Sequence, residues 1–141
     1  MEPQTAIIQK ASTSVGYNMI FYSGTLLRLD GVMDSQGEIF DHNTAIELPS
    51  NEVKVTLDFH EGPEFWLGKA TLYFAPGELR YDMILDNSKL PQHALETLIP
   101  CAGGMIKNRN GQSILHALIT SIGLTAHRNS DARIKPLKDQ T

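Results

Sequence analysis

The sequence has one cysteine, no long apolar run and no export signal. Cys101 stands alone among 141 residues, which excludes an internal disulfide framework. No stretch approaches the ~20 consecutive apolar residues that a membrane-spanning helix needs. The first residues include Glu2 and Pro3 and lack the apolar core of a secretory signal. These absences predict a cytoplasmic protein with no membrane partner.

An excess of basic residues is also missing. Twelve lysines and arginines stand against sixteen acids, which gives a formal net charge of -4. Affinity for nucleic acid comes mainly from Lys and Arg side chains that neutralise phosphates, so no nucleic-acid partner is expected. The most basic segment, from Arg128 to Lys138, is diluted by Asp131 and the adjoining Asp139 and is interpreted as part of a solvated tail.

The chain carries none of the common catalytic motifs. It has no G-x-S-x-G elbow, no phosphate-binding glycine loop and no zinc-protease pairing of histidine with glutamate. The sequence therefore favours a protein without a cofactor, and a binding role over an enzymatic one.

What the sequence does contain is the pattern of one folded domain. A chain of this length is long enough to bury its own core, and no shift in composition marks a second domain. We expect a single domain over residues 1–141, with a flexible N-terminal arm (about 1–16) and a polar C-terminal tail (about 128–141).

Residues 52–87 predict a β-meander, three consecutive strands joined by turns. The first segment alternates in the way of a half-buried strand, and its apolar face holds Val53, Val55, Leu57 and Phe59. Pro76-Gly77 separates the second segment from the third. Ile84 is the one residue that breaks the alternation of the third segment.

The remaining segments are shorter or ambiguous. Residues 17–29 are strand-like, with a bend predicted at Ser23-Gly24, and residues 90–99 have the spacing of one short helix. Residues 112–127 fit a helix or a strand. The preceding Asn110-Gly111 pair, typical of tight hairpins, favours the strand. The whole pattern predicts a mainly-β fold, an antiparallel β-sandwich (Ig-like or jelly-roll-like) with at most one or two short helices in the C-terminal half.

The aromatic residues around Trp66 are the main candidates for binding. Phe65 and Trp66 are consecutive and point to opposite faces of a strand, so a buried Phe65 leaves Trp66 exposed. An exposed Trp66 near Tyr73 would form a platform for a sugar ring or a hot spot for a protein partner. The alternative is that both faces of the strand are buried and Trp66 belongs to the core.

Histidines and the cysteine are the candidates for other chemistry. His42 and His60 lie in polar loops and, with Glu61, would suit an ion such as zinc if the two loops met at one end of a sandwich. Solvated loop residues are the simpler interpretation. Cys101 precedes a small-residue stretch that would expose its thiol as a turn, and a partly buried cysteine beside a glycine hinge is the simpler alternative.

Together these features predict a non-enzymatic β-sandwich module that recognises another protein or self-associates. Its predicted binding residues are Trp66, Phe65, Tyr73, His60 and His42. The first alternative is a carbohydrate-binding module that uses Trp66, Tyr73 and the acidic residues of the chain. A small metal- or Cys-dependent hydrolase is the second alternative.

Overall fold

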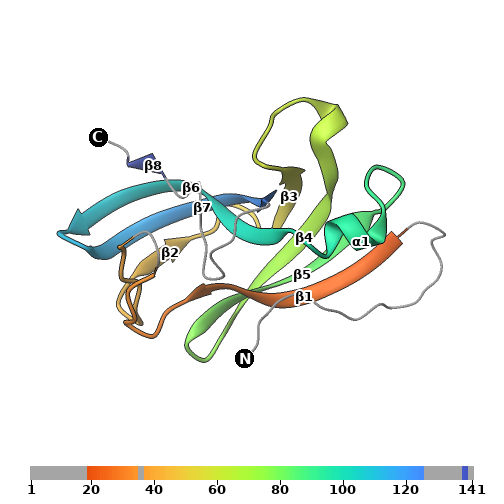
Figure 1. Ribbon diagram of the computed structural model, residues 1–141. Coiled ribbons are helices and arrows are strands. Elements are labelled where there is room, and N and C mark those ends of the chain that lie inside the picture. Colours follow the sequence, from red (N-terminus) through yellow and green to blue (C-terminus); the bar gives the residue numbers. More distant parts are fainter. Residues whose placement is uncertain (1–18, 35–36, 126–137, 140–141) are drawn as a thin grey trace.

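The structure of the chain is a computed structural model that describes residues 19–34, 37–125 and 138–139. Most of these residues form strands, and Figure 1 shows the strands arranged side by side. The predicted mainly-β class is confirmed. The predicted N-terminal arm lies outside the described residues, and so does all of the predicted tail except 138–139.

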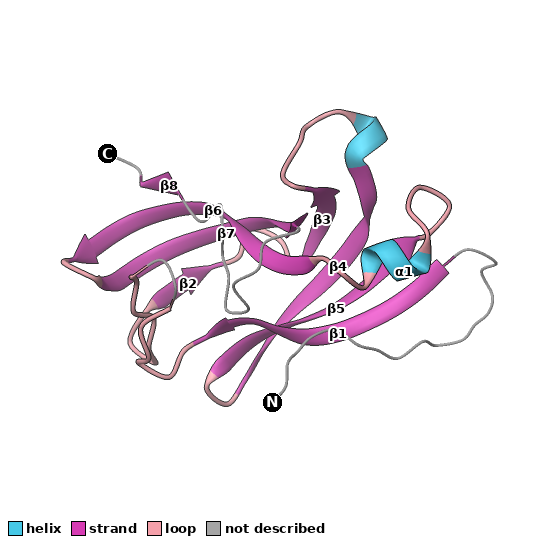
Figure 2. Ribbon diagram, in the orientation of Figure 1, coloured by secondary structure: helices cyan, strands magenta, loops and turns pink. Residues whose placement is uncertain are grey.

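All the strands belong to one sheet in the order β1-β5-β4-β3-β7-β6-β8, with β2 also beside β7. The two helical turns, coloured cyan in Figure 2, are the 3-10 turn η1 (Pro63–Phe65) and α1 (Gln92–Leu95). The strands in chain order are β1 (Met19–Arg28), β2 (Ala45–Glu47), β3 (Glu52–Leu57), β4 (Trp66–Ala75), β5 (Glu78–Asp86), β6 (Ile99–Asn110), β7 (Ser113–Thr125) and β8 (Lys138–Asp139).

The predicted meander is confirmed as β3, β4 and β5, which pair in sequence and antiparallel. Pro76 and Gly77 form the turn between β4 and β5, and Gly77 has the positive φ (74°) that tight turns need. The first strand ends earlier than the alternation predicts. After Leu57, Asp58 and Phe59 both take positive φ, so Phe59 does not continue the apolar face of β3.

Residues 112–127 form a strand, as the hairpin signal favoured: β7 follows β6 through a turn at Gly111 and Gln112. The apolar residues that allowed a helical interpretation lie on both faces because β7 is central in the sheet and is buried on both sides over its last four residues, 122–125. The predicted helix over 90–99 is reduced to the four residues of α1, and Ile99 already begins β6.

The predicted sandwich of two antiparallel sheets is not confirmed. The single sheet is mixed, because β2 and β3 both run parallel to β7, and β8 runs parallel to β6. Alternation along a strand reports that one face is buried. It does not report which strand lies beside it, or whether that neighbour runs parallel or antiparallel. The alternation therefore predicted the strands and the meander, but not the parallel neighbours of β2, β3 and β8.

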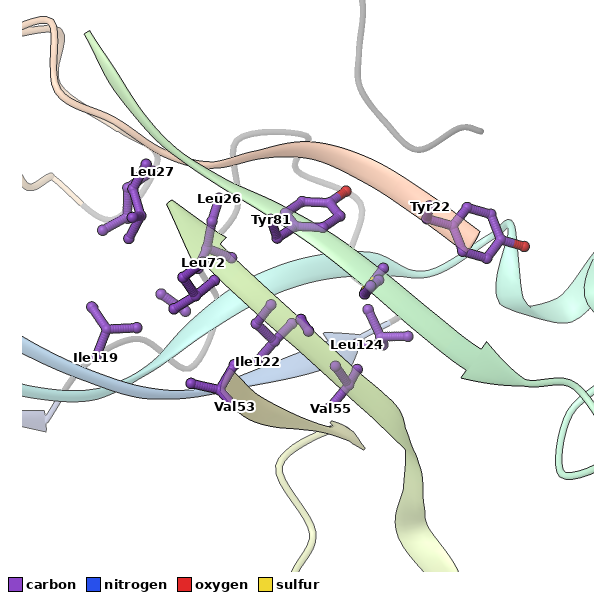
Figure 3. Close-up of a cluster of buried hydrophobic side chains, with 14 of the residues drawn as sticks. Tyr22, Leu26, Leu27, Val53, Val55, Leu72, Tyr81, Ile119, Ile122 and Leu124 are labelled. Atoms are coloured by element: carbon purple, nitrogen blue, oxygen red, sulfur yellow. The ribbon is translucent and has the colours of Figure 1, made fainter. Parts of the chain in front are cut away.

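The sheet curls over its own inner face and encloses the core. In a flat sheet β1 and β7 would lie four strand spacings apart, about 19 Å. Instead, Tyr22 and Leu26 of β1 share one cluster with Ile122 of β7 (Figure 3). The strands β1 and β6 also approach each other although no ladder joins them. The side of the sheet turned away from this core is called the outer face below.

The bend predicted at Ser23-Gly24 is not present. Register with β5 is continuous from Met19 to Thr25, and the irregularity lies at Leu26, between Thr25 and Leu27. The seven residues from Met19 to Thr25 therefore form an unbroken edge ladder.

Candidate functional site

The outer face of β1, β5 and β4 carries large apolar side chains that are exposed to solvent. Paired residues of neighbouring strands point to the same side. The register links Phe21 to Ile84 and Ile84 to Lys69, so these three side chains form one row across the outer face. Met19 is on the same face, two residues from Phe21. Met19 is 43% exposed and Phe21 is 38% exposed. Met19, Phe21 and Ile84 therefore form an apolar patch at the margin of the sheet, with Lys69 at its border.

Trp66 begins β4 and also lies on the outer face. It pairs with Thr56 of β3 at a bulge in which Leu67 is left without a partner residue. Its side chain is 46% exposed. The Lys54 ammonium nitrogen lies 5.2 Å from the centre of the indole ring, which is the range of a cation–π interaction. One face of the indole is therefore covered by Lys54.

Tyr73 lies on the same face but does not form a platform with Trp66. The two residues are seven positions apart on β4 with one bulge between them, which separates them by about 20 Å. The Tyr73 hydroxyl donates to Asp82 Oδ1 (3.2 Å) and accepts from Arg80 Nε (3.3 Å). The hydrogen bond with Tyr73 raises the pKa of Arg80 above its ordinary value. Tyr73 thus belongs to a polar network on the outer face.

Phe65 and His60 meet in the loop between β3 and β4. Their ring centres are 4.7 Å apart, with an angle of 36° between the ring planes. His60 is exposed, and its Nε2 lies 3.9 Å from Asp58 Oδ2. Phe65, the last residue of η1, is half-buried. The loop therefore brings two of the predicted binding residues together as one ring pair.

His42 does not join His60. It precedes β2, at the level of Ile114 on β7, because the neighbouring Thr44 hydroxyl donates to the Ile114 carbonyl (2.7 Å). His60 follows β3 beyond the level of Leu124, whose carbonyl accepts from the Asp58 N–H. Both strands run parallel to β7, so the two histidines are roughly 30 Å apart along it. No group of three metal-binding side chains occurs in the described ranges.

Cys101 lies in β6 and not in an exposed turn. Its exposed fraction is 0%, and its sulfur is 3.8 Å from the Thr125 hydroxyl of β7. The glycine that follows at 103 is part of the same strand. The buried position leaves the thiol without access to a substrate in solution.

One pairing of a histidine with a carboxylate was not expected from the sequence. His116 Nε2 lies 3.0 Å from Glu47 Oε1, and Lys107 Nζ lies 3.5 Å from the same oxygen. The hydrogen bond from His116 lowers the pKa of Glu47, and the charge of Lys107 lowers it further. These contacts join β2, β6 and β7, so they act as a link between strands.

The sequence analysis also missed the patch residues Met19, Phe21 and Ile84. The signal was present in two places. Residues 19–22 are apolar without alternation, which places apolar side chains on both faces of a strand, and Ile84 broke the pattern of β5. The register shows that the two irregularities belong together, because Phe21 pairs with Ile84.

Comparison of the chain with known protein families, with curated proteins and with solved structures finds no match. Among the described residues, no helix has the length and apolar character needed to cross a membrane.

Proposed function

We propose that the chain is a non-enzymatic binding module whose interaction surface is the outer face of β1, β5 and β4. The observation that carries the proposal is the exposure of Met19, Phe21 and Trp66 on this one face. Large apolar side chains grouped on one surface are typical of protein-interaction sites. The partner is another protein or a second copy of the chain.

Polar groups at the border of the apolar patch support this proposal. Lys69 and Lys54 continue the row that begins at Phe21 and Ile84, and Asp82 and Arg80 lie further along β5. An apolar centre with charged residues around it is the usual composition of a non-obligate protein interface. The charges of both signs would orient a partner, while the apolar patch supplies most of the binding free energy.

The alternatives fit the geometry less well. A sugar ring needs an open aromatic face, but Lys54 covers one face of the Trp66 indole and Tyr73 is far from it. A hydrolase needs a nucleophile and a base within reach of each other. Cys101 is buried, and His42 and His60 lie at different levels of β7.

Site-specific photo-crosslinking tests the proposal. A benzophenone amino acid placed at Phe21 should give covalent adducts in the cells that express the chain, because the surface is occupied there. The matched control is the same probe at Leu115, which is 41% exposed on β7. The mass of the adduct distinguishes another protein from a second copy.

Equal crosslinking at positions 21 and 115, or none at either, would contradict the proposal. Quenching of fluorescence by acrylamide gives an independent readout, because Trp66 is the one tryptophan of the chain. Binding of a partner protein over the outer face should reduce the quenching of Trp66, and removal of the partner should restore it.

A further inference from the structure

We infer that β1, at the margin of the outer face, pairs antiparallel with β1 of a second copy of the chain. This inference rests on the proposed function and names its partner. The two curled sheets would then form one continuous sheet across a two-fold axis, and Phe21 would lie close to the axis on the outer face.

The first observation is that β1 is an edge strand. It heads the order of the sheet and pairs with β5 on one side, and no described strand pairs with its other side. Figure 1 shows β1 along one margin of the molecule. The unpaired N–H and C=O groups of such an edge form a template for another strand.

The second observation is that β1 lacks the features that usually protect an edge. Protected edges are short, or carry lysine or proline, or bulge early. The strand has ten residues, no charged residue from Met19 to Leu27 and no proline. Its ladder is unbroken from Met19 to Thr25. Two exposed apolar side chains, Met19 and Phe21, stand beside this edge.

The third observation is that two copies of β1 can pair with each other without opposing like charges. A two-fold axis perpendicular to the sheet pairs antiparallel strands and keeps both outer faces on the same side. Whatever the register within Met19–Thr25, only uncharged residues face one another, so no like charges are opposed. A charged partner strand would find no opposite charge on β1 between Met19 and Leu27, whereas an identical strand needs none.

The opposite edge of the sheet, formed by β6 and β8, differs in each of these respects. There, β6 carries Lys107 and Arg109, and its backbone is already paired with β8 at Met105 and Ile106. Self-pairing of β6 would bring basic side chains together and displace an existing partner. The preference for β1 over β6 therefore follows from charge and from occupancy.

The test is sedimentation velocity of the full chain over a wide concentration range. The wild-type chain should show a monomer–dimer equilibrium. The variant Phe21→Lys should raise the dissociation constant at least tenfold, because it places two ammonium groups near the axis. Leu115→Lys is the matched control, since it adds the same charge at an exposed apolar residue of β7 and should leave the dissociation constant unchanged.

Circular dichroism and thermal unfolding check that each variant is folded. Met19→Lys, at a residue 43% exposed on the same face, provides a second variant if Phe21→Lys does not fold. A wild-type chain that stays monomeric at the highest concentration would overturn the inference, and so would equal dimerisation of wild type and folded Phe21→Lys or Met19→Lys. If position 21 crosslinks to a different protein while the chain is monomeric, the inference fails and the proposed function stands.

Discussion

The ring of Phe59 lies directly on the backbone of β7 at Gly123. A Cβ atom at this glycine would come within 2.5 Å of two ring carbons, Cε2 and Cζ. A Cβ at Gly103 of β6 would lie 2.6 Å from Cε1 of the same ring. The positive φ of Phe59 (63°) turns the side chain out of the line of β3 and over these two strands. Two glycines and one turn residue thus form a small packing site on the outer face.

The first prediction is that Gly123→Ala destabilises the protein by about 1–3 kcal/mol, because the added methyl group forces the Phe59 ring to move. Urea unfolding measures the free energy. The same substitution in a Phe59→Ala background should cost clearly less, since the ring is absent. Equal costs in the two backgrounds would mean that the contact with Phe59 does not determine the requirement for glycine.

The second prediction concerns Tyr22, whose hydroxyl is buried without a hydrogen-bond partner among the described residues. Removing an unpaired buried hydroxyl leaves no partner unsatisfied, so Tyr22→Phe should leave the free energy of unfolding at neutral pH unchanged or raise it by up to about 1 kcal/mol. Urea unfolding near pH 7 measures this. A loss of several kcal/mol would show that the hydroxyl has a stabilising contact.

The third prediction is the pH dependence that Tyr22 confers. Burial raises the pKa of Tyr22 to about 12, and the negative charge of Glu96 contributes to the rise. An unfolded tyrosine ionises near pH 10. The folded state therefore keeps the proton up to a higher pH than the unfolded state does. The free energy of unfolding falls as the pH rises from about 10 to about 12.

Tyr22→Phe should remove this part of the alkaline loss, which amounts to about 3 kcal/mol for a shift of this size. Unfolding free energies of both proteins, measured in steps from pH 8 to pH 12, compare the two curves. Parallel curves over the whole range would contradict the assignment of the alkaline loss to Tyr22.

The fourth prediction concerns the contact of Lys54 with Trp66. Replacing Lys54 by serine uncovers one face of the indole, so acrylamide should quench the single tryptophan more strongly in the monomer. The loss of stability should be small, about 0.5–1 kcal/mol, because the pair is exposed. Lys69→Ser, a nearby lysine on the same face, is the control and should leave the quenching constant unchanged.

The fifth prediction compares two ion pairs of different burial. Arg109 Nη2 lies 2.8 Å from Glu38 Oε2, and the Glu38 side chain is only 11% exposed. Arg109→Ala should cost about 1–3 kcal/mol, because it leaves a charged group of low exposure without this hydrogen bond. Lys69 and Glu52 form a pair of similar length (3.0 Å) with both side chains mostly exposed. Lys69→Ala should cost about 0–1 kcal/mol in the same unfolding assay.

Local patterns in the sequence were enough for the elements whose partners lie close along the chain. The meander β3-β4-β5 and the hairpin β6-β7 are joined by short connections, and the turn residues Pro76, Gly77 and Gly111 mark two of them. The mixed sheet could not be predicted in this way. The parallel register of Val55 with Ile122 depends on packing between segments that are remote in the sequence.

The candidate site was predicted in part for the same reason. Trp66 is exposed, but Phe65 belongs to the turn η1 and not to the strand, so the two are not opposed along one strand as predicted. The distance of Trp66 from Tyr73 and the separation of His42 from His60 depend on register and strand order. The small residues after Cys101 were interpreted as a turn. They lie in a strand that pairs with β7, and Gly103 leaves room for the Phe59 ring, a contact that no local pattern encodes.

The parallel seam between β3 and β7 has a consequence for folding kinetics. The meander and the hairpin can each form from neighbouring residues, and such local contacts form quickly. Joining them at Val55 and Ile122 closes a loop of 67 residues, which is the difference between the two positions. The entropy of that closure is lost before the core between the two halves is complete. We therefore expect the pairing of β3 with β7 to be the slow step of folding. Substitutions along these two paired strands should slow folding more than substitutions within the meander or the hairpin.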